Sequence, residues 1–156
     1  LFKTDLSIIK SVIKSNEKRK KLLTEKIIKI LSNKIKNKKI AFLGVTFKPN
    51  TDDMRESSSL LMIPFLLKKG AKINYYDPSG IKNEFSKYRK LLFCDNINKA
   101  CNNSDLIIIH TDWEEFKALD FKKLNKKRNF KIYDMRNLYS AEIMKKKGLS
   151  YYSVGR

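Results

Sequence analysis

The sequence is poor in several features that would point to particular classes of protein. It has only two cysteines, Cys94 and Cys101, which is too few for a disulfide framework, so we expect a reducing, cytoplasmic setting. No apolar run reaches the length that a membrane-spanning helix needs. The first residues, 1–3, have no signal-peptide pattern and no methionine. We therefore interpret the sequence as a piece of a longer protein.

Patterns typical of nucleic-acid-binding proteins are also missing, although 35 basic and 16 acidic residues give a formal net charge of +19. We find no RNP, zinc-finger or KH pattern. Lysine, which is less suited than arginine to reading base edges, carries most of the positive charge. We therefore interpret the charge as a solvated, lysine-coated surface. A basic α/β nucleic-acid-binding module remains the alternative interpretation.

A long helix is predicted over residues 5–32, because no glycine or proline interrupts them. Asp5 is placed to cap the amino end of this helix. Apolar side chains recur on one helical stripe, which also carries Asn16 and Lys20: Leu6, Ile9, Ile13, Leu23, Ile27, Ile30 and Leu31. The stripe either packs on the chain's own sheet or forms a connecting, dimer-forming helix. We assign residues 1–33 to this helix.

Strand and helix patterns alternate along residues 38–156, which we assign to one Rossmann-like domain. This alternation predicts an α/β fold with a parallel sheet flanked by helices and preceded by the long helix. The predicted strands are 39–44, 72–76, 91–94, 105–110, 130–133 and 150–154. The predicted helices are about 57–69, 81–89, 96–101, 113–117, 121–127 and 139–147.

The helix at 57–69 carries two local signals. Glu56 is expected in its first turn, behind a serine cap, where a negative charge suits the positive helix end. Pro64 is expected to kink the helix or to shorten its first part.

The loop at 44–59 is the candidate binding site, because it follows the first strand at the edge where open α/β sheets bind ligands. It lacks the G-x-G-x-x-G pattern, so we do not expect it to hold NAD by the pyrophosphate. Lys48 and nearby hydroxyl groups could still hold a phosphate. From the residues alone, Phe47 is interpreted as a core residue. Asp52 and Asp53 are interpreted as solvated or capping groups, not as metal ligands.

No other residues form a recognisable catalytic set. His110 follows an apolar strand and could act as a general base, but we interpret it as structural or simply exposed. Cys94 and Cys101 are interpreted as buried packing residues. A bidentate guanidinium cannot be replaced by lysine, so the scarce arginines are of more interest. Three of them lie in motif-like places: Arg55, Arg136 and Arg156.

Five motifs, in family order along the chain, resemble the C-terminal domain of the UDP-glucose 6-dehydrogenase family. They are FKPNTDDMRESSS at 47–59, YDP at 76–78, HTDWEEF at 110–116, DMRN at 134–137 and YSVGR at 152–156. The predicted long helix resembles the central helix of this family, which joins its two Rossmann-like domains and forms much of the dimer core.

The resemblance implies an NAD-dependent enzyme of polysaccharide biosynthesis, which oxidises UDP-glucose to UDP-glucuronate through a cysteine thiolate. GDP-mannose and UDP-N-acetylhexosamine are the substrates of related enzymes. By position, the resemblance implies that Phe47, Lys48 and Arg136 bind the UDP-sugar, and that Arg55 reaches the NAD side of the cleft. It also implies a homodimer formed through the N-terminal helix, with no membrane, nucleic-acid or metal partner.

The cofactor and the nucleophile are expected outside these 156 residues. NAD would be bound mainly by an N-terminal domain. Neither Cys94 nor Cys101 occupies the position of the family's catalytic cysteine. We therefore expect the isolated chain to be inactive as a dehydrogenase.

Overall fold

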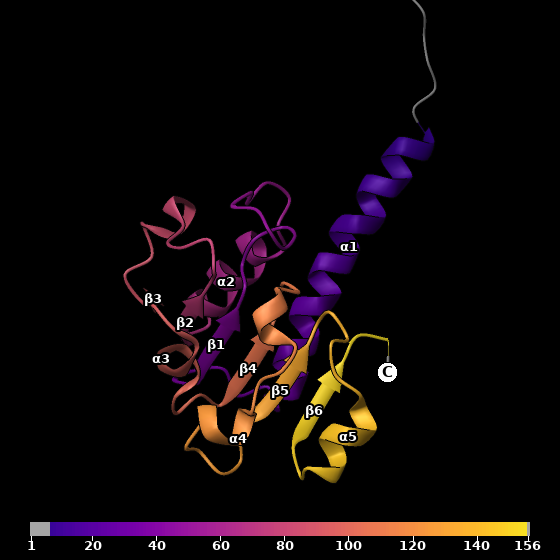
Figure 1. Ribbon diagram of the computed structural model, residues 1–156. Helices are drawn as coiled ribbons and strands as arrows, with labels where there is room; N and C mark the ends of the chain where they lie inside the picture. Colours follow the sequence, from indigo (N-terminus) through magenta and orange to yellow (C-terminus); the bar gives the residue numbers. More distant parts are fainter. Residues whose placement is uncertain (1–6, 156) are drawn as a thin grey trace, which may run out of the picture.

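The computed structural model describes residues 7–155 (Figure 1), so the predicted positions of Asp5, Leu6 and Arg156 lie outside the described residues. Within them, a six-stranded parallel sheet has the strand order β3-β2-β1-β4-β5-β6. This is the order of a doubly wound Rossmann fold and confirms the predicted fold class. The strands are β1 (Lys39–Leu43), β2 (Lys72–Tyr76), β3 (Leu91–Phe93), β4 (Leu106–Ile109), β5 (Lys131–Asp134) and β6 (Ser150–Ser153).

Within residues 7–155, α1 precedes the first strand, and four further α-helices and two 3-10 turns connect the strands. Two of the predicted helices, at 81–89 and 113–117, are only single 3-10 turns, and the one predicted at 121–127 is a single α-turn. The elements are α1 (Ser7–Ile30), α2 (Ser59–Lys68), η1 (Asn83–Phe85), α3 (Ile97–Cys101), η2 (Glu114–Phe116), α4 (Phe121–Leu124) and α5 (Ala141–Lys146). None of these helices is long and apolar enough to cross a membrane.

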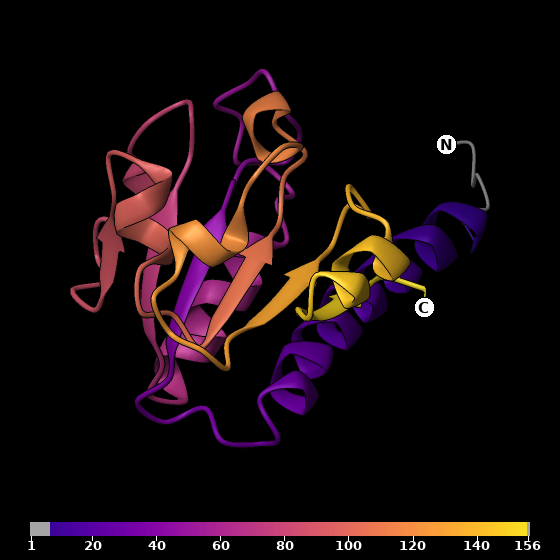
Figure 2. The same ribbon diagram turned by 60° about the horizontal axis from the view of Figure 1, so that its bottom comes forward.

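The helices cover both faces of the sheet, as the continuous apolar strands require. Successive side chains of a strand point to opposite faces. Ile40 and Phe42 of β1 therefore pack in the core with α1 and α2, whereas Ala41 and Leu43 pack with α3, α4 and α5. Figure 2 shows α1 (indigo) behind the sheet and α4 (orange) in front of it. All four residues of β4 are fully buried, which confirms the prediction of a central strand.

Helix α1 divides into a buried half and an exposed half, so each interpretation of its apolar stripe describes one part of it. Ile27 and Ile30, near its carboxyl end, are 0% and 5% exposed and belong to the core. Ile9 and Ile13, near its amino end, are 55% and 58% exposed. Figure 1 shows these first turns extending beyond the sheet. The first turns of α1 therefore carry the part of the apolar stripe that the core does not bury.

The amino end of α2 differs from the prediction. The helix begins at Ser59, not at Ser57, and it continues past Pro64. Glu56 lies outside the helix, because its backbone has the left-handed conformation (φ +60°), which a right-handed helix does not contain. The hydroxyl of Ser57 donates to the carbonyl oxygen of Val45 (2.7 Å), and its oxygen accepts the backbone N–H of Ser59 (3.3 Å), the first residue of α2. The end of the 44–59 loop is therefore tied to its beginning.

Candidate functional site

A cavity of about 570 Å³ lies where α1 meets the 44–59 loop and the residues that follow β4 and β5. The sheet order reverses between β1 and β4, and the crevice at such a point is where doubly wound sheets bind ligands. The three residues predicted for substrate binding, Phe47, Lys48 and Arg136, all line this cavity. They come from loops that follow β1 and β5, far apart in sequence.

Phe47 corrects one interpretation made from the residues alone. It is 49% exposed and lines the cavity, so it is not a core residue. The two residues before it, Val45 and Thr46, are fully buried at the end of β1. The chain leaves the core between Thr46 and Phe47, which places an aromatic ring at the mouth of the site. This exposure is compatible with the substrate contact that the family resemblance implies, and not with the core position inferred from hydrophobicity.

The guanidinium of Arg136 is held by backbone carbonyl groups of two residues that follow other strands, β4 and β1. Its Nε donates to the carbonyl oxygen of His110 (2.8 Å), and one of its Nη atoms donates to that of Phe47 (3.2 Å). Asp112 lies 3.6 Å from Nε. The backbone N–H of Arg136 donates to the buried carboxylate of Asp134 (2.9 Å), which fixes the turn after β5. The arginine is therefore oriented, with 37% of its side chain still exposed for a ligand.

Two cations of the cavity, Lys48 and Arg19, make no hydrogen bond or ion pair with the described residues 7–155. Arg19 lies on α1 and was not predicted as a site residue. Its signal in the sequence is an arginine in a lysine-rich helix, three residues after Asn16, which also lines the cavity. The cavity is thus lined by one carboxylate, that of Glu56, and by four cationic side chains: Arg19, Lys20, Lys48 and Arg136. This excess of positive charge favours an anionic ligand.

An ion pair joins α1 to the 44–59 loop. Lys20 Nζ lies 2.7 Å from Glu56 Oε2 and 3.0 Å from Glu17 Oε1. The hydrogen bond to Glu56 raises the pKa of Lys20, and the same bond lowers the pKa of Glu56. Glu56, whose backbone is left-handed (φ +60°), thus links the loop to α1. Lys20 is therefore occupied by protein carboxylates, and the cationic groups available to a ligand are Lys48, Arg19 and the second Nη of Arg136.

His110 lines the cavity and is 2% exposed, so the interpretation that it is simply exposed is wrong. Thr111 donates its hydroxyl to the carbonyl of Thr46 (2.9 Å), so its oxygen accepts from His110 Nδ1–H (3.1 Å). His110 Nε2 then accepts from the hydroxyl of Ser58 (2.9 Å). Burial first, and the charge of Arg136 second, lower the pKa of His110 to about 3. The ring is neutral at physiological pH and acts as a spacer between the loops.

A family model described as the UDP binding domain of the UDP-glucose/GDP-mannose dehydrogenase family matches residues 41–141. The chain belongs to this family. The UDP-glucose 6-dehydrogenase of Rickettsia bellii is 40% identical over 154 residues, which are 97% of this chain and 36% of that protein. The UDP-glucose 6-dehydrogenase of Rhizobium meliloti is 35% identical over 98% of this chain and 35% of its own length.

Solved structures agree with this family assignment. The UDP-D-ManNAc dehydrogenase of Pyrococcus horikoshii has a TM-score of 0.78 and 25% identity over 99% of this chain and 35% of its own. An NDP-N-acetyl-D-galactosaminuronic acid dehydrogenase of Methanosarcina mazei has a TM-score of 0.71 and 28% identity, over 88% of this chain and 29% of its own. The chain thus spans about a third of the length of these relatives.

Arg55, the residue predicted for the cofactor side, lies outside the cavity of this dehydrogenase-family domain. Its side chain is 89% exposed, and its Nε and one Nη each lie 3.0 Å from a carboxylate oxygen of Asp53. Arg55 lowers the pKa of Asp53 to about 2. Asp53 also accepts the backbone N–H of Arg55, which closes a turn before α2 and caps no helix. Within residues 7–155, no three His, Cys, Asp or Glu side chains are grouped as a metal site would need.

The two cysteines are distant from the candidate chemistry, because neither lines the cavity. Cys101 is fully buried, as predicted, and burial raises its pKa to about 12. Cys94 is only partly buried, so the packing interpretation is correct for Cys101 and too strong for Cys94. Burial raises the pKa of Cys94 as well. Neither thiol has the lowered pKa that an activated nucleophile needs.

The first turn of this domain does not fit the pyrophosphate of NAD, although dinucleotide-binding Rossmann domains hold it at that place. The backbone N–H groups of Val45 and Thr46 donate to the carboxylate of Asp77 (2.7 and 3.3 Å). They are therefore not free to bind a phosphate. A close approach of the cofactor is also blocked at Gly44, where a Cβ atom would lie 2.5 Å from the side chain of Thr111.

Proposed function

We propose that the chain is the C-terminal, substrate-binding domain of an NAD-dependent enzyme that oxidises UDP-glucose to UDP-glucuronate. The observation that carries this proposal is the meeting of Phe47, Lys48 and Arg136 in one cavity, on loops that follow different strands. Membership of the family supports the same function, as do the relatives named UDP-glucose 6-dehydrogenase.

The cationic residues of the cavity suit the diphosphate of a UDP-sugar. Arg136 is held by carbonyl oxygens through Nε and one Nη, so its other Nη is free to donate to a phosphate or sugar oxygen. Lys48 supplies a point charge from the 44–59 loop, and Arg19 supplies a second guanidinium from α1. The exposed ring of Phe47 offers an apolar surface to the base or the sugar.

NAD, in this proposal, is bound mainly by a separate domain, because the first turn of this one is bonded to Asp77. Arg55 would approach the cofactor from its exposed position. Its ion pair with Asp53 would have to open or to be shared. The chemical step would take place at a cysteine thiolate of that separate domain. We therefore expect the purified 156-residue chain to form no NADH from UDP-glucose.

The exposed half of α1 is proposed as a contact surface for a second copy of the chain. Its apolar residues lie on successive turns and are more than half exposed: Ile8, Ile9, Val12 and Ile13. Surfaces of this kind are typical of helices that pack against a partner. Asn16, in the same stripe, would set the register of the pairing.

Isothermal titration of the 156-residue chain tests the binding function. UDP-glucose and UDP should bind, and Lys48→Ala should weaken both. Lys123→Ala is the matched control, since Lys123 is 85% exposed and lies on α4. Titration with duplex DNA at several salt concentrations tests the nucleic-acid alternative, which predicts an affinity that falls steeply with salt. Absence of UDP binding together with such DNA binding would overturn the proposal.

A further inference from the structure

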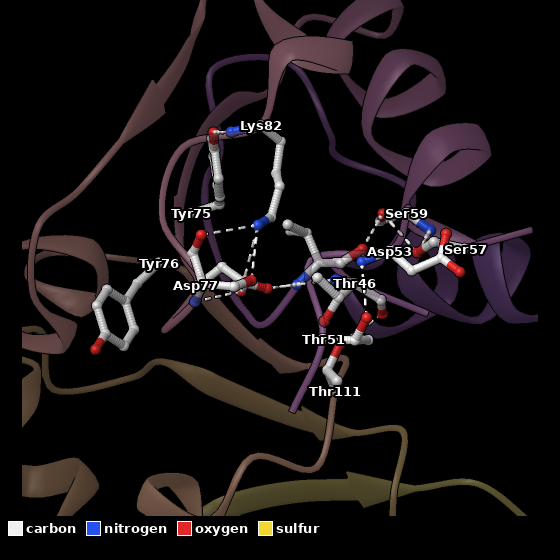
Figure 3. A network of polar contacts seen from close by, with 12 residues as sticks. Thr46, Thr51, Asp53, Ser57, Ser59, Tyr75, Tyr76, Asp77, Lys82 and Thr111 are labelled. Atoms are coloured by element: carbon white, nitrogen blue, oxygen red, sulfur yellow. Dashed lines mark hydrogen bonds and ion pairs between the residues drawn. The ribbon is translucent and has the colours of Figure 1, made fainter. Parts of the chain in front are cut away.

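The carboxylate of Asp77 joins the end of β2 to the end of β1 (Figure 3). It is fully buried, and its Oδ2 accepts the backbone N–H groups of Val45 (2.7 Å) and Thr46 (3.3 Å). Its Oδ1 accepts the backbone N–H (3.0 Å) and the hydroxyl (2.5 Å) of Ser79. One side chain therefore accepts four hydrogen bonds, two from the loop that carries Phe47 and two from its own turn.

A buried lysine balances the charge of this carboxylate. Lys82 is 4% exposed, and its Nζ lies 3.9 Å from Asp77 Oδ1. The same Nζ donates to the hydroxyl oxygen of Ser79 (2.7 Å) and to its carbonyl oxygen (3.2 Å). The backbone N–H of Lys82 donates to the hydroxyl of Tyr75 (3.0 Å), which fixes the start of the lysine. Burying two charges in this way is costly unless the geometry is well satisfied, and here it is satisfied on both sides.

The position of Asp77 is where a dinucleotide-binding Rossmann domain would recognise its ligand. In such a domain the N–H groups of the first βα turn hold the pyrophosphate, and an acidic residue after β2 holds the ribose. Here the acidic residue after β2 occupies the N–H groups itself. Thr111 holds the same residue from its other end by donating to the carbonyl oxygen of Thr46 (2.9 Å). The loop is thereby fixed from β2 and from β4.

We propose that Asp77 is a positioning residue that replaces a bound phosphate within the first βα turn and so holds Phe47 and Lys48 toward the UDP-sugar cavity. The part that concerns the UDP-sugar rests on the proposed function. The part that concerns the loop stands on the contacts of Asp77 alone. Asp77 touches no ligand itself and acts through the two residues that follow its hydrogen-bonded amides.

Asparagine has the size of aspartate but cannot replace it here. Four donors point at the carboxylate of Asp77, two at each oxygen. In Asp77→Asn one of the two carboxylate oxygens is replaced by an NH2 group. This group faces two donors and can accept a hydrogen bond from neither. Either the loop amides or the turn of Ser79 must then lose its partner. We expect the loop to shift, because Asn would also leave the charge of Lys82 buried without its counter-ion.

Amide hydrogen exchange, followed by NMR on the 156-residue chain without ligand, tests the loop directly. In Asp77→Asn we expect the Val45 and Thr46 amides to exchange at least tenfold faster, while the amides of β4 keep their protection. Asp95→Asn is the matched control, since this exposed carboxylate follows β3 at the same sheet edge. If folding is impaired, the double variant Asp77→Asn with Lys82→Met is used instead. It removes both buried charges and still lacks the second carboxylate oxygen as an acceptor.

UDP titration of the same proteins separates this inference from the proposed function. We expect UDP affinity to fall on the order of 10- to 100-fold in Asp77→Asn and in the double variant, and Lys48→Ala to add little in the Asp77→Asn background. Unchanged exchange at Val45 and Thr46 would overturn the proposal, and so would equal loss of protection throughout the sheet. If the unaltered chain does not bind UDP, the proposed function fails, and the exchange result alone still decides the role of Asp77.

Discussion

Arg136 and Phe47 are joined directly, because an Nη atom of the arginine donates to the carbonyl oxygen of the phenylalanine (3.2 Å). The two residues belong to loops after β5 and β1, and the hydrogen bond fixes the distance between them. A second bond, from Nε to the carbonyl of His110 (2.8 Å), fixes the plane of the guanidinium. The site is therefore partly pre-organised, which reduces the entropy that binding must overcome.

Replacing Arg136 should weaken UDP-glucose binding and also lower stability. Arg136→Ala removes a charged donor, worth about 1.5–3 kcal/mol of binding, or roughly 10- to 150-fold in affinity. Arg136→Lys should recover little, because one ammonium cannot hold two carbonyls and a ligand in one plane. Titration calorimetry measures the affinity, and thermal unfolding measures the stability. Arg128→Lys, on an exposed loop, is the control and should change neither.

Gly44 should tolerate alanine less well than Gly80, although both have a left-handed backbone (φ +74° and +86°). The added Cβ at Gly44 would lie 2.5 Å from Thr111 Cβ, whereas at Gly80 nothing lies within 4 Å. Overpacking of this kind costs about 1–3 kcal/mol, in addition to the backbone strain that both variants share. Urea unfolding of Gly44→Ala and Gly80→Ala measures the difference. Equal loss in the two variants would show that Thr111 moves away without cost.

The fold was predictable from the sequence because its signals are local. An apolar run such as Leu106–Ile109 predicts a buried parallel strand, and that prediction depends on no other part of the chain. The amino end of α2 was not predictable, because the left-handed backbone of Glu56 is associated with its partner Lys20, which lies 36 residues earlier. Local charge rules place Glu56 in the helix, whereas in the structure it lies outside the helix and pairs with Lys20.

The candidate site was predictable only where motif position carried the information. Lys48 and Arg136 were found through their place after strands and through the family motifs, and the structure brings them to one cavity. Arg19 was missed because the pattern of a helix does not show which of its faces meets a distant loop. Phe47 was misjudged from hydrophobicity, because an aromatic residue at a ligand site and one in the core have the same composition signal.

Charged residues on the exposed half of α1 should prevent self-association. Ile9 and Ile13 are each more than half exposed, and lysine at both positions would bring like charges together in a helix pair. We expect light scattering to give a dimer for the unaltered chain and a monomer for Ile9→Lys with Ile13→Lys. Lys10→Glu with Lys14→Glu, at exposed neighbouring positions, is the control for a change of charge alone. A monomer in the unaltered chain at all concentrations would contradict this prediction.

His110 should make the protein sensitive to mild acid. Its pKa is about 3 in the folded chain, against an ordinary value of 6.5, because burial and Arg136 disfavour the charged ring. Between these values the unfolded chain binds one more proton than the folded chain, so stability must fall as the pH drops below 6.5. The slope approaches about 1.4 kcal/mol per pH unit for one proton.

Thermal unfolding between pH 5 and 6.5 measures this effect before most carboxylates begin to titrate. The sequence contains one histidine, so His110→Gln removes the only imidazole. Glutamine can still accept from Ser58 but loses the bond to Thr111, so the variant should be less stable at pH 7. Its melting temperature should nevertheless change less than that of the unaltered chain as the pH falls from 6.5 to 5. Parallel curves for the two proteins would mean that the ring of His110 takes up a proton in the folded state.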